Sequence, residues 1–101
     1  MRKPRVIHIY GRRWFERVNG NTYHTCDIWV DGQHVHKVPF NYGYGSMYRQ
    51  NAEVWLRDSG YLPGIESYAN TGTFESLWRY CDRHGIHFVD EVDDVPRKRD
   101  I

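Results

Sequence analysis

Polar and apolar residues alternate along three successive segments near the start of the chain, residues 12–18, 21–30 and 33–40. The pairs Asn19-Gly20 and Asp31-Gly32 separate these segments. Asn-Gly and Asp-Gly between alternating segments are typical of two-residue hairpin turns, which also fix the register of the strands. The pattern therefore predicts a three-stranded antiparallel meander.

The predicted register sorts the side chains of the meander onto two faces. With a two-residue turn at 31–32, Trp29 lies opposite His34, and Asp27 lies opposite His36. With a two-residue turn at 19–20, Glu16 falls beside Tyr23. One face is then rich in aromatic and charged groups, namely Arg12, Trp14, Tyr23, Asp27, Trp29, His34 and His36. The other carries an ordinary apolar set that helices could cover, namely Phe15, Cys26, Ile28, Val30 and Val35.

The segments that flank the meander predict one further strand and a helix. Residues 5–10 alternate as a strand, and Gly11 would allow a bend before the meander begins. After an irregular stretch at 41–45, Ser46 is a good N-cap for a helix over about residues 47–58.

The second half of the chain predicts a connection, another helix and a last strand. Residues 61–72 read as an ordered connection with one helical turn around 65–68. Thr73 can cap a second helix, which Gly85 ends, because apolar residues recur at helical spacing in Phe74, Leu77, Trp78 and Cys81. Residues 86–92 read as the final strand.

Together these elements predict an α+β domain. We expect an antiparallel sheet of four to five strands, two main helices packed on one face, and a C-terminal strand. The 101 residues suffice for one hydrophobic core, so we assign a single domain to residues 1–92. Residues 93–101 are charged and predict a flexible tail.

Composition narrows the classes of partner. Lys and Arg total 14 against 13 Asp and Glu, and a net charge of +1 gives no global field that would attract nucleic acid or an anionic membrane. The chain lacks an apolar run long enough for a membrane span, and we expect a cytoplasmic protein without a cofactor. Cys26 and Cys81 predict buried free thiols.

Three side chains of the meander suggest a metal or acid/base site. His34 and His36 are two residues apart and would point to the same face, with Asp27 beside them as a third candidate ligand. The same carboxylate could instead orient an imidazole base. Cys26 is expected in the core and Ser46 is explained as a helix cap, so neither is a placed nucleophile. Flanking surface histidines are the simpler interpretation.

A phosphate or nucleotide site is the next candidate. Tyr42, Tyr44 and Ser46 belong to a glycine-rich run that ends at a predicted helix N-terminus, where free N–H groups favour an anion. Arg12 and Arg13 could add guanidinium contacts, and the aromatic rings could stack on bases. Alternatively the aromatic residues form a second small core, or they anchor a protein partner.

Three phrases of the sequence, Gly11-Arg12-Arg13-Trp14-Phe15, Gly20-Asn21-Thr22-Tyr23-His24 and Tyr42-Gly43-Tyr44-Gly45, resemble a group of small uncharacterised proteins encoded by bacteriophages and prophages. The likeness covers residues 6–62 and transfers no catalytic or binding residue. It implies a context in which small phage products bind and inhibit a host component, including CRISPR or nucleotide-signalling defence.

The leading hypothesis is thus a small non-enzymatic phage accessory protein that binds a host defence protein through its aromatic, Arg and His face in the host cytoplasm. A signal-nucleotide sponge is the first alternative, and near-neutral charge disfavours it. A metal-dependent or acid/base enzyme that uses His34, His36 and Asp27 is the second. The aromatic face and an edge strand at residues 5–10 give two routes to a homodimer.

Overall fold

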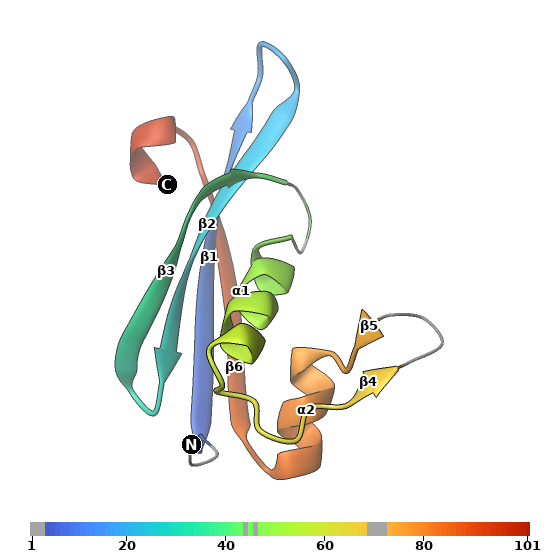
Figure 1. Ribbon diagram of the computed structural model, residues 1–101. Helices are drawn as coiled ribbons and strands as arrows, with labels where there is room; N and C mark the ends of the chain where they lie inside the picture. The colour runs from blue at the N-terminus through green and yellow to red at the C-terminus, as the bar shows by residue number, and fades with distance from the viewer. Residues whose placement is uncertain (1–3, 44, 46, 69–72) are drawn as a thin grey trace.

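The main sheet has four strands, and the computed structural model describes residues 4–43, 45, 47–68 and 73–101. The strands lie in the spatial order β3, β2, β1, β6. Figure 1 shows them as long neighbouring ribbons. Their bounds are β1 Val6–Glu16, β2 Asn21–Val30, β3 Gln33–Tyr42 and β6 His87–Val95.

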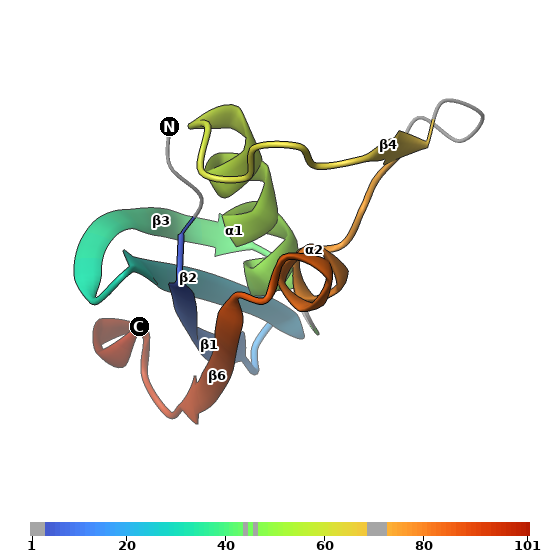
Figure 2. The same cartoon turned by 90° about the horizontal axis from the view of Figure 1, so that it is seen from below.

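Two helices lie on one side of this sheet (Figures 1 and 2). They are α1, Met47–Asp58, and α2, Leu77–His84. Two short strands, β4 (Ser67–Tyr68) and β5 (Thr73–Phe74), pair with each other apart from the main sheet. A short 3₁₀ helix, η1 (Lys98–Asp100), follows β6 near the C-terminus.

The sheet is mixed, which corrects the expectation of a purely antiparallel one. Strand β6 runs parallel to β1, with Val6 opposite His87 and Trp14 opposite Val95. The chain returns from β3 through both helices, and such a crossover permits a parallel partner. Strand β1 is therefore internal, so residues 5–10 are no sheet edge and that route to a homodimer is removed. The predicted domain boundary at residue 92 falls inside β6.

The β1–β2 hairpin has a different register from the predicted one. Trp14 lies opposite Tyr23 and Glu16 opposite Asn21, so residues 17–20 form the connection in place of a two-residue turn. The register differs by two residues from the prediction. Because side chains alternate with a period of two, the assignment of this hairpin to faces is unchanged.

The β2–β3 pair carries two irregularities that move side chains between faces. Trp29 lies opposite His34 as predicted, but His36 lies opposite Ile28 because the register shifts between these two pairs. A bulge at residue 35 adds one residue to β3 and turns the following side chains over, until the second shift, between the partners of Cys26 and His24, turns them back. His36 therefore lies on the helix side, and its predicted pairing with Asp27 is wrong.

The core lies between the sheet and the two helices. Its fully buried members include Ile7, Ile9, Cys26, Ile28, Ala52, Leu56, Leu77 and Tyr80. Gly11 continues β1 without interruption, and its role is close packing, since a Cβ there would lie 2.5 Å from the ring of Tyr48. The glycine that suggested a bend thus marks a close approach of α1 to the sheet.

The helix ends agree with the sequence in one case and differ in another. Helix α1 has the predicted bounds, with Tyr48, Ala52 and Leu56 buried. Helix α2 begins after Ser76 rather than after Thr73, because residues 73–74 pair as β5. The predicted helical turn around 65–68 is also wrong, since β4 occupies its second half.

Buried polar contacts hold α1 and the end of β3 in place. The fully buried His24 lies 3.2 Å from the carbonyl oxygen of Gly43 through Nδ1 and 2.7 Å from the amide of Asn51 through Nε2. The hydroxyl of Tyr48 donates to Asp90 at 2.7 Å, and Arg49 contacts the same carboxylate at 2.7 Å. The His24 contacts tie Gly43 and α1 to β2, and the Asp90 contacts tie α1 to β6.

Both cysteines are free and buried, as the sequence predicts. Burial raises the pKa of each thiol, Cys26 and Cys81, to about 12. Thiolate is the reactive form, so neither side chain is a nucleophile at neutral pH. Within the described residues, neither helix is long and apolar enough to cross a membrane.

Candidate functional site

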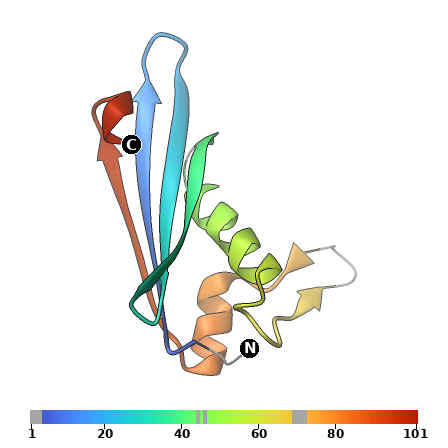
Figure 3. The same ribbon diagram turned by 60° about the vertical axis from the view of Figure 1, so that its left-hand side comes forward.

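The candidate site is the sheet face opposite α1 and α2, called here the open face. Figures 2 and 3 show both helices on one side of the sheet and η1 on the other. The even-numbered residues of β1 and the odd-numbered residues of β2 supply most of this face. Its rings, imidazoles and carboxylates belong to His8, Tyr10, Trp14, Tyr23, Asp27, Trp29, His34, Phe40, Tyr42, Glu91 and Asp93.

One end of the open face carries a row of aromatic rings across three strands. Trp14 on β1 and Tyr23 on β2 lie with ring centroids 5.8 Å apart, and Tyr23 and Phe40 on β3 are 4.9 Å apart. Tyr42 meets Tyr23 edge to face at 5.8 Å. Phe40 and Tyr42 remain 43% and 56% exposed. This group is the aromatic row.

Three rings of this row, Trp14, Tyr23 and Phe40, stack on one another from strand to strand. The planes of Tyr23 and Phe40 differ by 15°, and rings so nearly parallel at 4.9 Å must overlap face to face. Neighbouring strands are only about 4.8 Å apart, so the overlap runs from strand to strand. The faces of Tyr23 and Phe40 therefore contact each other, whereas Tyr42 meets Tyr23 edge to face.

The other end of the open face carries imidazoles around Trp29. His8 stacks on Trp29 at 5.1 Å and His34 meets it edge to face at 5.2 Å. Nε2 of His34 lies 2.9 Å from Oδ1 of Asp27. Asp27 therefore contacts His34, not His36. This group of four residues is the imidazole end.

Charges of both signs border these groups. The Tyr10 hydroxyl donates to Asp93, and the Arg12 guanidinium lies 5.1 Å from the centre of the Tyr10 ring. His8 lies 3.4 Å from Glu91. The Lys98 ammonium of η1 lies 5.5 Å from the Phe40 ring, which brings the C-terminal segment against the aromatic row. The open face thus has no uniform electrostatic sign.

The metal candidates do not come together. The ring of His36 stacks on Trp55 of α1, with centroids 4.4 Å apart and planes 1° apart, on the side away from His34. The described ranges contain no group of three or more His, Cys, Asp or Glu side chains that could hold a metal ion. Of the three candidate ligands, only His34 and Asp27 contact each other.

The remaining predicted site residues fall in two places. Tyr44 and Ser46 lie outside the described residues, so the predicted anion site at the start of α1 rests on Tyr42 and its neighbours alone. Arg12 lies on the open face, whereas Arg13 points to the helix side and donates to Asp94 and to the carbonyl oxygen of Gly45. The two arginines therefore cannot grip one phosphate together.

Two carboxyl groups on the helix side, those of Glu53 and Glu75, have pKa values that are shifted in opposite directions. Burial raises the pKa of Glu53, whose carboxylate accepts the backbone N–H of Leu77 at 3.0 Å. Arg83 lowers the pKa of the buried Glu75 through two hydrogen bonds of 2.9 and 2.7 Å. Each carboxylate ties helix α1 or α2 to a neighbouring segment, which is a structural role.

Sequence reasoning missed the contribution of the first half of β1. His8 and Tyr10 were assigned to a separate strand before a bend, so their place beside Trp29 and Asp27 was not predicted. The signal was present, because the alternation of residues 6–16 continues through Gly11. Gly11 lies inside one continuous strand and not at a bend between two.

Comparisons with known proteins add no relative: no protein family, no curated protein and no solved structure matches this chain. The site is therefore interpreted from its own geometry.

Proposed function

We propose that this protein is a small non-enzymatic binding protein that holds a host protein against its open face and inhibits it. The observation that carries the proposal is the aromatic row, whose rings contact one another across three strands while Phe40 and Tyr42 stay about half exposed. Tyr, Trp and Phe are enriched in the centres of protein interfaces, where they combine a large apolar area with few rotatable bonds. The resemblance to small phage-encoded proteins supports a host defence protein as the target.

The ring orientation favours a protein over a nucleotide on this face. Proteins that bind bases on a sheet use exposed flat ring faces. In the aromatic row Trp14, Tyr23 and Phe40 cover faces of one another, and Lys98 lies over the Phe40 ring. A cluster of stacked rings with mixed charge around it suits a surface of apolar side chains with a polar rim.

Charge supports the same choice. Binding to nucleic acid depends strongly on Lys and Arg that neutralise phosphates. Around the imidazole end and β6, Asp27, Glu91 and Asp93 offset the cations of Arg12, Lys37 and Lys98. A polyanion therefore gains no net attraction here, whereas a protein with its own mixed charges can find complementary groups.

The enzyme alternative has less support. It requires His34, His36 and Asp27 in one cluster, and the bulge at residue 35 separates the two imidazoles. The contact between His34 and Asp27 resembles the orienting half of a catalytic group. Both thiols are buried and protonated, so they supply no nucleophile to it.

The test compares the open face with an equally exposed aromatic elsewhere. Tagged wild type, Tyr42→Ala and Trp78→Ala are used to isolate a partner from bacterial host lysate, and the affinity for the purified partner is then measured by calorimetry. Tyr42 and Trp78 are each 56% exposed, but Trp78 lies on α2. We expect Tyr42→Ala to lose at least about tenfold in affinity.

The control variant makes the result decisive. Trp78→Ala should bind the partner like wild type, and both variants should keep the wild-type melting temperature within a few degrees. If Trp78→Ala loses the partner while Tyr42→Ala keeps it, the helix side is the interface and the proposal is wrong.

A further inference from the structure

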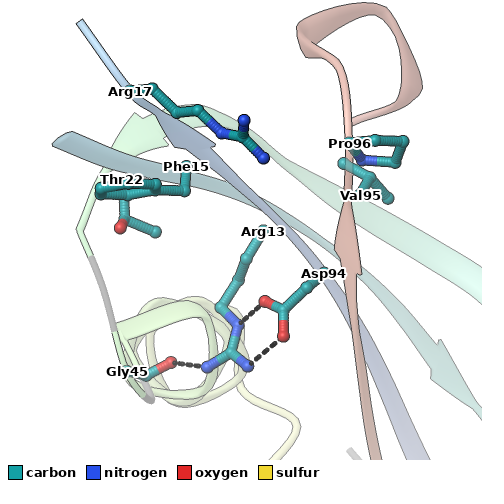
Figure 4. A pocket seen from close by; sticks show the side chains of 8 residues that line it. All are labelled: Arg13, Phe15, Arg17, Thr22, Gly45, Asp94, Val95 and Pro96. Atoms are coloured by element: carbon teal, nitrogen blue, oxygen red, sulfur yellow. Dashed lines mark hydrogen bonds and ion pairs between the residues drawn. The ribbon is translucent and has the colours of Figure 1, made fainter. Parts of the chain in front are cut away.

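A second concave site lies beyond the N-terminal end of α1, on the helix side of the sheet. It is a cavity of about 380 Å³ at the outer end of the β1–β2 hairpin. Figure 4 shows its lining residues, which are Arg13, Phe15, Arg17, Thr22, Gly45, Asp94, Val95 and Pro96. A cavity of this size falls in the range of small-molecule sites.

The base of this cavity is rigidly built. Arg13 donates through Nε at 2.8 Å and through Nη2 at 3.1 Å to the two carboxylate oxygens of Asp94. Its Nη1 donates to the carbonyl oxygen of Gly45 at 3.0 Å. One guanidinium thus joins β1, β6 and the segment before α1, and a bidentate pair has fixed geometry. Two of the five N–H donors of Arg13 remain available.

The second guanidinium, that of Arg17, has no such partner among the described residues. Arg17 extends across the hollow in Figure 4, between Phe15 on one side and Val95 and Pro96 on the other. No hydrogen bond or ion pair joins Arg17 to another described residue. Because Asp94 is neutralised by Arg13, the charge of Arg17 is the uncompensated charge of the cavity.

Apolar surface accompanies this charge. Phe15 is 56% exposed although it lies on the side of the sheet that faces the core. The β1–β2 hairpin projects past the end of α1, so the helix does not reach this ring (Figure 1). Pro96 offers a flat apolar surface on the opposite wall, and Thr22 adds a hydroxyl beside Phe15.

We infer that this cavity binds a small ligand that joins a phosphate group to an aromatic ring, the chemistry of a nucleoside monophosphate. Arg17 and the hydroxyl of Thr22 contact the phosphate, which carries about −1.5 to −2 charges at neutral pH. The aromatic ring of the ligand packs against the exposed Phe15 ring. This cavity is separate from the open face, so the inference does not depend on the proposed protein partner.

Titration of the full-length protein tests the inference with three probes: adenosine monophosphate, adenosine and inorganic phosphate. Binding is followed by calorimetry and by amide NMR shifts. We expect adenosine monophosphate to bind tightest and to shift the amides of Thr22, Gly45 and Asp94. Raising the salt concentration should weaken it, because exposed charges are screened.

Two variants and a matched control separate the contributions. Arg17→Gln should weaken adenosine monophosphate at least about tenfold. Phe15→Leu should weaken the nucleotide but leave the phosphate affinity unchanged, whereas Arg79→Gln on the exposed surface of α2 should bind like wild type. Equal binding of inorganic phosphate and nucleotide, an unchanged Arg17→Gln variant, or no saturable binding at millimolar concentration would each overturn the inference.

Discussion

The two faces of the main sheet are built from alternating residues of the same strands, and they use their side chains differently. On the covered face, Ile7, Ile9 and Ile28 are fully buried under α1 and α2. On the open face, Phe40 and Tyr42 stay about half exposed. Burial of aliphatic side chains on one face supplies stability, whereas the half-exposed rings of the other face contribute less to it.

The largest expected contrast between the faces is in the free energy of unfolding. Ile28→Ala removes a fully buried side chain and should cost about 2–5 kcal/mol. Tyr42→Ala, on a residue 56% exposed, should change stability by less than about 0.5 kcal/mol. Urea denaturation followed by circular dichroism measures both, and similar losses in the two variants would contradict the division between faces.

Neighbouring residues of β1 sharpen the same contrast. Gly11→Ala would place a Cβ 2.5 Å from the ring of Tyr48, and such overpacking should cost about 1–3 kcal/mol. Arg12→Ala points to the open face and should remain within about 0.5 kcal/mol of wild type. If Gly11→Ala is as stable as wild type, the close contact between α1 and β1 is not a constraint.

Protonation should matter on the helix side through Glu75. Arg83 lowers the pKa of this carboxyl in the folded state, so the unfolded chain binds its proton more readily. Stability from Glu75 is therefore present above its ordinary pKa of about 4–5 and is lost as the pH falls below it. Glu75→Gln should have a flatter loss of stability between about pH 6 and about pH 3 than wild type.

Glu53 provides a control, because its contribution to the pH dependence of stability has the opposite sign. Burial raises its pKa, so its protonation in the folded state adds stability as the pH falls through that raised value. Glu53→Gln removes this gain and should lose stability more steeply on acidification than wild type. Urea midpoints across the pH series decide both cases, and identical slopes in all three proteins would contradict both assignments.

The sequence predicts much of the covered face and less of the open one. Alternation and turn residues identify the meander, and the spacing of Tyr48, Ala52 and Leu56 identifies α1. The residues around position 35 give no local sequence signal for the bulge. The bulge is accompanied by stacking of His36 on Trp55, and a contact between residues so distant in sequence is not visible in the alternation pattern. The parallel pairing of β6 with β1 also has no local signal, because it depends on how α1 and α2 pack and bring the chain back to the sheet.

The prediction of the open face was correct near one turn and wrong farther from it. A hairpin register is local, and the predicted opposition of Trp29 and His34 next to the turn is confirmed. Beyond the bulge, every side-chain assignment depends on long-range packing, so His36 was assigned to the wrong face. Predictions of a surface from alternation are most secure close to the turn that sets the register.

A small effect on stability is expected for the contact between Asp27 and His34. Asp27→Asn removes a carboxylate whose Oδ1 lies 2.9 Å from the His34 ring, and cross-strand charged pairs contribute only about 0.2–1 kcal/mol. Its effect on partner binding should be larger than its effect on folding, because the pair holds the His34 ring beside Trp29. Calorimetry with the purified partner and urea denaturation give the two numbers. A stability loss larger than the loss of binding free energy would make the imidazole end a structural element and would confine recognition to the aromatic row.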